Sequence, residues 1–92
     1  KAFDCAKIKG NLVLRRPEPH DEIQFLGGRK SVRKFFVDEK VPQDIRKQTL
    51  VLCDEQQVMW IIGYRMSEAF KISELTNLAL QIRIIGGKDE SY

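Results

Sequence analysis

Residues 27–47 read GGRKSVRKFFVDEKVPQDIRK, and the rest of the chain is interpreted outward from this segment. Placed on a helix at about 100° per residue, Val32, Phe35 and Phe36 fall on one face of residues 31–39. The basic residues crowd the opposite side, so such a helix can dock on its own domain while presenting positive charge. The segment holds seven basic residues against three acidic ones, whereas the whole chain has a net charge of only +3.

The boundaries of this helix are marked by turn-forming residues. The glycine pair 27–28 allows a sharp turn before the helix. Val41-Pro42 ends it, because the residue before a proline is driven out of the α region. Proline then suits the first turn of another helix. We therefore expect two consecutive short helices, at residues 31–39 and 42–48.

The positive excess over these two helices favours an anionic partner such as a nucleic acid. A charged helix face is also the ordinary solvent-facing side of a soluble domain, and basic residues there often pair with acids three or four positions away. Both interpretations stay open on this segment. Such pairs would join Lys34, Lys40 and Arg46 to Asp38, Glu39 and Asp44.

Strands are expected on both sides of the basic segment. Leu78, Leu80, Ile82 and Ile84 alternate with other residues near the end of the chain and are expected to face inward. With two adjacent helices and no βαβ rhythm, the pattern favours a small α+β domain, mainly antiparallel and β-sandwich-like. Apolar alternation or continuous apolar runs predict strands at residues 11–15, 22–25, 49–53, 58–62 and 77–85.

Length and composition describe one ordinary domain. Of the 92 residues, 42% are hydrophobic and 32% charged, and no apolar run approaches the roughly 18 residues of a membrane span. Because the sequence begins at Lys1 without a methionine, we expect a domain cut from a larger protein. We divide the chain into an N-terminal lead-in (1–10), the domain itself (11–85) and a flexible tail (86–92).

Residues for independent catalysis or metal binding are not expected in this chain. His20 is the only histidine, and Cys5 and Cys53 fit neither a disulfide framework nor a zinc site. Two reduced thiols fit the cytoplasm. The glycines before Arg29 lack the spacing of a phosphate loop, and the carboxylates are scattered rather than paired. We therefore expect no catalytic residue, metal or cofactor in the chain itself.

Four motifs in a fixed order and spacing resemble one family. They are RxPxxxD (15–21), FLGG (25–28) followed by Lys30, KFFVDEKVP (34–42) followed by Arg46, and GYRMSEAFK (63–71). Together they resemble the C-terminal substrate-binding domain of the bacterial tRNA(Ile)-lysidine synthetases, over about residues 11 to 85. The KFFVDEKVP and GYRMSEAFK segments are the most specific, because residue type, order and separation agree at once.

The resemblance implies a specific function for the parent enzyme. Such an enzyme uses ATP, with Mg, to adenylate the wobble cytidine of a tRNA(Ile) with a CAU anticodon and then attaches lysine, forming lysidine. These steps belong to an N-terminal domain with a pyrophosphate loop that this sequence lacks. The C-terminal domain contacts the acceptor-stem side of the tRNA. Its fold is similar to a domain of the phenylalanyl-tRNA synthetase β subunit, a β-sandwich-like body with short helices.

The resemblance also implies which residues bind tRNA, and which partners the domain has. The partners are the tRNA(Ile) acceptor stem and the N-terminal domains of the same enzyme. For Arg65, a structural ion pair with Glu68 or Glu74 fits the sequence as well as an RNA contact does. A second hypothesis is a protein-interaction module that positions the enzyme's other domains without touching RNA. The matching basic positions are Arg15, Lys30, Lys34, Lys40, Arg46 and Arg65, and the helix pattern adds Arg29 and Arg33.

Overall fold

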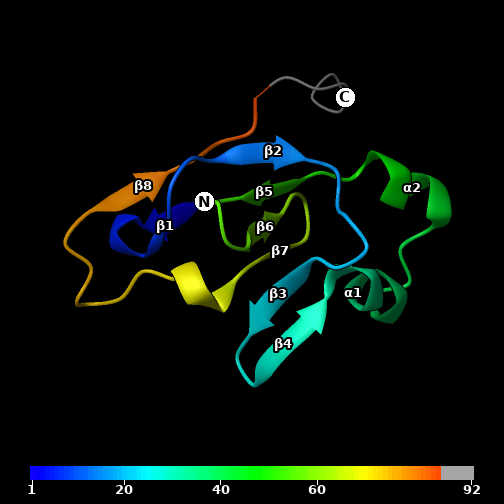
Figure 1. Ribbon diagram of the computed structural model, residues 1–92, viewed down its shortest axis with the longest axis horizontal. Coiled ribbons are helices and arrows are strands. Elements are labelled where there is room, and N and C mark those ends of the chain that lie inside the picture. Colours follow the sequence, from blue (N-terminus) through cyan, green and yellow to red (C-terminus); the bar gives the residue numbers. More distant parts are fainter. Residues whose placement is uncertain (86–92) are drawn as a thin grey trace.

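The centre of the fold is an antiparallel sheet whose strands are, in spatial order, β2 (Val13–Arg15), β5 (Val51–Cys53), β6 (Val58–Ile61) and β7 (Arg65–Met66) (Figure 1). The computed structural model describes residues 1–85. β5 and β6 form the expected hairpin, with Leu52 opposite Trp60. Every residue of both strands is buried, which explains why these two stretches are apolar on both faces.

Two smaller antiparallel pairs accompany this sheet: β3 (Glu22–Phe25) with β4 (Gly28–Ser31), and β1 (Ala2–Asp4) with β8 (Ala79–Gln81). The sequence pattern does not predict β4, because a glycine turn leading straight into a helix hides a strand of four residues. β1 lies within the predicted lead-in, yet its Phe3 is fully buried. The described residues form three antiparallel sheets, two α-helices and two short 3₁₀ helices (Cys5–Lys7 and Glu68–Phe70), which confirms the predicted α+β fold.

Both predicted helices are present. α1 (Val32–Asp38) begins after Ser31, whose Oγ accepts a hydrogen bond from the Lys34 N–H at 3.0 Å. α2 (Gln43–Gln48) begins directly after Pro42, as the proline predicts. The apolar face of α1 is buried through Val32 and its two phenylalanines, while the basic residues between them are exposed.

The C-terminal end of α1 explains how the chain turns into α2. Lys40 adopts a left-handed conformation with φ +56°. Its N–H donates to the Val37 carbonyl and the Val41 N–H donates to the Phe36 carbonyl, each at 3.0 Å. This is the paired hydrogen-bond pattern of a Schellman motif, in which the left-handed position is usually glycine. Val41 and Phe36 also pack in the same core, so the motif directs the chain back toward the sheet.

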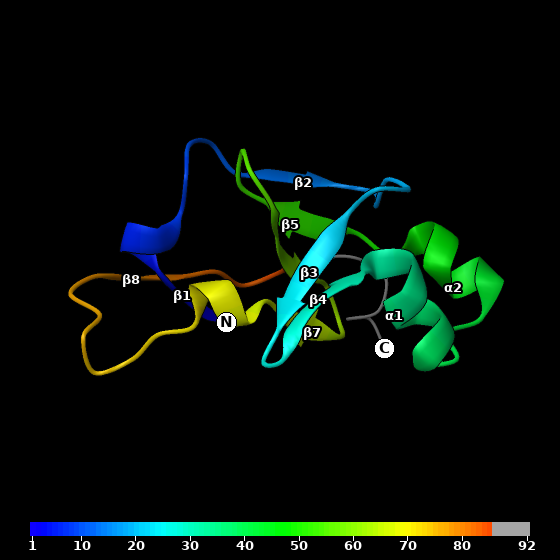
Figure 2. The same ribbon diagram turned by 60° about the horizontal axis from the view of Figure 1, so that its bottom comes forward.

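The core has two parts, with the helices at one end of the molecule and the β1–β8 pair at the other (Figures 1 and 2). Near α1, Phe35 and Phe36 pack with Ile23, Val51 and Ile61. In the other part, Trp60 meets Phe3 edge to face, with ring centroids 5.9 Å apart. A short 3₁₀ helix, Glu68–Phe70, buries Phe70 in this second part.

The end of the described chain departs from the sequence pattern. β8 is only three residues long, and two residues expected to face inward, Leu78 and Ile84, are 65% and 49% exposed. Leu80 is half-buried. The reason is that β8 pairs only with the equally short β1, so packing does not cover the whole alternating stretch. The predicted flexible tail at 86–92 lies outside the described residues.

Within residues 1–85, neither helix has the length and apolar character that crossing a bilayer requires.

Candidate nucleic-acid interface

The eight basic residues predicted to bind RNA come from several elements of the fold. One detail of the prediction is wrong: two of them lie on β4, in a strand, and not on the basic side of a helix. The others lie at the end of β2, on α1 and α2, at the junction between the helices, and on β7. In chain order the eight are Arg15, Arg29, Lys30, Arg33, Lys34, Lys40, Arg46 and Arg65.

Lys30 and Lys34 share one carboxylate, Asp38. The Lys30 Nζ lies 2.7 Å from Asp38 Oδ2, and the Lys34 Nζ lies 3.5 Å from Asp38 Oδ1, one helical turn away. The hydrogen bond from Lys30, together with both positive charges, lowers the pKa of Asp38. This surface cluster is the helix ion pair that the sequence leaves open for Lys34. Because all three side chains are exposed, it contributes little stability and can exchange for another anion.

Phe25 is covered by two cations on the same part of the surface. The Arg65 guanidinium carbon lies 4.5 Å and the Lys30 Nζ 5.2 Å from the centre of its ring. Phe25 also stacks on Phe35, with centroids 6.0 Å apart. Arg65 is in addition 3.9 Å from Glu68 Oε2, which agrees with the ion-pair alternative for this residue. We call the surface formed by Lys30, Lys34, Asp38 and Arg65 the hairpin face.

Arg15 is held by a buried acid. Its Nη1 and Nη2 donate to the two Asp21 carboxylate oxygens at 2.7 and 3.0 Å. This bidentate bond raises the pKa of Arg15. Burial alone would raise the pKa of Asp21, but the hydrogen bonds from Arg15 and from the Glu18 N–H outweigh it and lower that pKa. Asp21 therefore stays ionised, and Arg15 is committed to an internal role.

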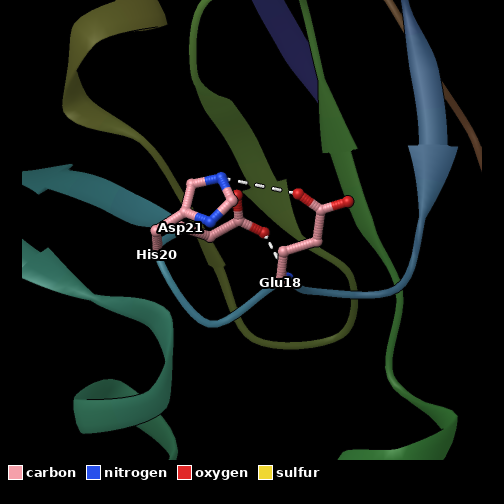
Figure 3. A group of neighbouring side chains, drawn as sticks. All are labelled: Glu18, His20 and Asp21. Carbon is pink, nitrogen blue, oxygen red and sulfur yellow. Dashed lines mark hydrogen bonds and ion pairs between the residues drawn. The ribbon is translucent and has the colours of Figure 1, made fainter.

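The same carboxylate fixes the loop between β2 and β3. Asp21 Oδ2 accepts a hydrogen bond from the Glu18 N–H at 2.7 Å (Figure 3), and Arg15 Nη1 also donates to the Arg16 carbonyl at 3.0 Å.

Figure 3 also shows the His20 ring next to the Glu18 side chain, with Nε2 3.5 Å from Oε1. Their ligand atoms and those of Asp21 lie within 4.8 Å of one another. This group is poorly suited to a cation, because the Arg15 guanidinium already occupies both Asp21 oxygens.

Three of the predicted residues form no ion pair within residues 1–85, in contrast to those described above: Arg33, Lys40 and Arg46. Arg33 and Arg46 line a shallow pocket of about 270 Å³ between the β2–β3 loop and the two helices. Arg16 and Lys47 line it too, and neither forms an ion pair in the described part of the chain. We call this the basic pocket; its lining residues are Arg16, Pro17, Glu18, Pro19, Val32, Arg33, Phe36, Gln43, Arg46 and Lys47.

The predicted set of eight RNA-binding residues does not include Arg16 and Lys47. Each is adjacent to a residue that the family motifs do include, Arg15 and Arg46, so a motif comparison made position by position passes over it. The available indication was local. Arg16 follows Arg15 at the end of β2, and Lys47 follows Arg46 near the end of α2. Loops and helix ends of this kind can bring side chains from different elements together. The convergence itself depends on tertiary structure.

The two thiols lie outside this site. Cys53 is 2% exposed, and burial raises its pKa to about 11, so it is a protonated thiol at neutral pH. Cys5 is half-buried.

A family model described as the TilS substrate C-terminal domain matches residues 12–83. The chain belongs to this family. The match confirms the resemblance carried by the four motifs, and it covers the whole of the basic pocket and the hairpin face.

Relatives and a solved structure agree with the assignment. A tRNA(Ile)-lysidine synthase of Clostridium tetani is 37% identical over 91 residues, covering 97% of this chain and 20% of the relative. One of Caldanaerobacter subterraneus is 39% identical over 84 residues, covering 89% and 18%. The chain thus spans about a fifth of these relatives' length. A crystal structure of a TilS C-terminal domain has the same fold, with a TM-score of 0.71 at 22% identity, covering 85% of this chain and 62% of that one.

Proposed function

We propose that this chain is the non-catalytic tRNA-binding domain of a tRNA(Ile)-lysidine synthase, and that it contacts the acceptor-stem side of tRNA(Ile). The relatives of this family are named as tRNA(Ile)-lysidine synthases, which supplies the class of ligand. One observation carries the RNA contact: basic side chains without an acidic partner, within the described residues, gather at one pocket formed by three chain segments.

The proposed interaction is neutralisation of phosphates combined with recognition of shape. An A-form stem has a deep, narrow major groove that side chains cannot readily enter, so contacts fall on phosphates, 2′-hydroxyls and the shallow groove. Arg33 and Arg46, in the basic pocket, and Lys40, at the helix junction, can contact phosphate without first breaking an ion pair. Lys30 and Lys34 can exchange Asp38 for a phosphate at small cost, because that cluster is exposed.

Chemistry belongs, in this proposal, to the rest of the enzyme. Adenylation of the wobble cytidine and attachment of lysine take place in other domains, which bind ATP and Mg, and the whole enzyme works in the cytoplasm. This chain holds the tRNA body at a distance from the reacting base and rejects tRNAs whose stems fit poorly.

A second candidate function is supported by a separate observation. β2 is an edge strand of the central sheet, and Leu12, Val13 and Leu14 are 38–47% exposed. An exposed apolar edge is typical of a surface that packs against another domain. The chain could therefore position the other domains of the synthase through this edge, with or without RNA contact.

The deciding experiment is fluorescence anisotropy of the chain with a tRNA(Ile) acceptor-stem hairpin, in 50 mM and 200 mM salt. An anticodon-stem hairpin of the same length serves as the matched RNA. We expect micromolar binding to the acceptor stem that weakens with salt, with a slope of about −4 for four or five phosphate contacts. A folded chain that binds neither RNA but binds the remainder of the synthase would replace the first function with the second.

A further inference from the structure

We infer that the basic pocket is a subsite for one backbone phosphate of the bound RNA, and that it fixes position without reading sequence. The inference rests on the proposed function, which it narrows from a basic domain to a particular cavity and ligand group. Three properties of the cavity support it: its charge, the fixed placement of Arg46, and its size.

The charge of the pocket is strongly one-sided. Four basic residues line it, Arg16, Arg33, Arg46 and Lys47, against one carboxylate, that of Glu18. Within residues 1–85 none of the four is neutralised by an ion pair, whereas the basic residues of the hairpin face all have acidic partners. Unneutralised cations that converge on one cavity repel one another. An anion that enters relieves this repulsion and so lowers the free energy of the domain.

One cation of the pocket, Arg46, is held in place before any ligand binds. The Arg46 Nε donates to the Val41 carbonyl at 2.8 Å, which fixes the plane of the guanidinium. Its two Nη nitrogens form no other hydrogen bond within the described residues, so they remain for a ligand. Arg33 projects from α1 next to buried Val32, and the loop that carries Arg16 is fixed by the Arg15–Asp21 bond. Such preorganisation lowers the entropic cost of binding.

The size and lining of the pocket favour a phosphate with its sugar over a larger ligand. About 270 Å³ is slightly below the range of pockets for drug-sized molecules, roughly 300–1,000 Å³. Apart from the cations, the lining is mainly carbon, from Pro17, Pro19, Val32 and Phe36. Cations that contact phosphate oxygens position a nucleic acid but carry no base information. The pocket should therefore contribute equally to all RNA stems that reach it.

The test uses a double variant, Arg33→Ala with Lys47→Ala, that removes two pocket charges. Its matched control is Lys9→Ala with Arg83→Ala, which removes one lysine and one arginine that are exposed, form no ion pair within residues 1–85 and do not line the pocket. Both are measured against the acceptor-stem hairpin and a hairpin of the same length with permuted sequence. We expect the pocket variant to lose affinity about tenfold on both RNAs and its salt slope to become shallower by about 0.9, the change for one phosphate contact. The control should change much less, and urea unfolding should show both variants folded.

The other outcomes separate the two claims. If the chain binds RNA and both double variants weaken it equally, the pocket is not the subsite, although the proposed function stands. Loss on the acceptor-stem sequence alone would overturn the claim that the pocket does not read sequence. If the chain binds no RNA, the proposed function fails, and a titration with inorganic phosphate followed by amide NMR decides on the pocket. Saturable shifts at residues 16–19, 33 and 46–47 would retain an anion site, and their absence would remove it.

Discussion

Asp21 and Asp38 both hold basic side chains, and they do so in opposite surroundings. Asp21 is buried in the loop that lines the basic pocket, with 6% of its side chain exposed, and binds one arginine through both oxygens. Asp38 lies on the hairpin face with 36% of its side chain exposed, and binds two lysines. All three cations, Arg15, Lys30 and Lys34, belong to the predicted RNA-binding set.

The difference shows that equal charges in a sequence are not equally available to a ligand. Arg15 would leave a buried carboxylate unpaired if it turned to RNA, so it acts by positioning the loop. Lys30 and Lys34 can exchange an exposed acid for a phosphate. Arg33 and Arg46, with no ion pair in the described residues, need no exchange at all. Availability therefore rises from the buried pair, through the hairpin face, to the pocket.

The largest effect expected from this comparison is on stability, for Asp21→Ala. The substitution leaves the Arg15 guanidinium and the Glu18 N–H without their acceptor. We expect the free energy of unfolding to fall by about 2–3 kcal/mol, below the usual value for a fully buried pair because Arg15 is 30% exposed. Urea unfolding measures it. Asp38→Ala is the matched control and should leave the midpoint nearly unchanged, and equal losses in the two variants would contradict the distinction drawn here.

The contribution of the Asp21 carboxylate should also appear in the pH dependence of the unfolding free energy. The folded pKa of Asp21 is lowered from 3.8, so its pair contributes fully above the ordinary carboxylate range, and this contribution is lost as pH falls through the lowered value. We expect the unfolding free energy of the unaltered chain to decrease below about pH 4, and Asp21→Asn to flatten that decrease. Circular dichroism during acid titration is sufficient. Asp38→Asn should retain the decrease, because its carboxylate is exposed.

Much of the fold could be predicted because its signals are local. The two helices follow from the apolar spacing of Val32, Phe35 and Phe36 and from Pro42. The central hairpin follows from two short runs that are apolar on both faces. β4 could not be predicted, because Arg29 and Lys30 are typical of a helix surface and their strand conformation depends on pairing with β3. β1 depends in the same way on β8, whose paired residues are 75 to 79 positions away along the chain.

The candidate site was predictable in its residue types but not in its grouping. Four motifs identified the family and six basic positions. They could not show that Arg15 lies against a buried acid, since that depends on the loop folding back through Asp21. They also could not bring Arg16 and Lys47 to one pocket, because that depends on α2 packing near the β2–β3 loop. Pairing and convergence are tertiary properties, so the eight predicted RNA contacts remain predictions to be separated by experiment.

A smaller effect, and of opposite sign, is expected for RNA affinity in Asp38→Asn. The substitution releases Lys30 and Lys34 from their shared acid and removes one repulsive charge. We expect affinity for the acceptor-stem hairpin to rise about threefold to fivefold at low salt and to return to the unaltered value at high salt. Glu39→Gln is the matched control, since Glu39 is exposed and has no ion pair within residues 1–85. If Glu39→Gln strengthens binding as much, only net charge matters and the hairpin face has no particular role.

The smallest effect should separate stability from binding at a single residue, Lys40. Its φ of +56° is a conformation that glycine adopts without strain, although glycine also loses more chain entropy on folding. We therefore expect Lys40→Gly to raise the free energy of unfolding by only about 0.5 kcal/mol. Lys40→Ala removes the same charge without relieving the strain and should not be stabilised. If Lys40 contacts phosphate, both variants must bind RNA more weakly by the same factor, because they lose the same charge. A weakening confined to Lys40→Ala would instead trace the effect to the Schellman turn, and neither variant weakening would remove Lys40 from the interface.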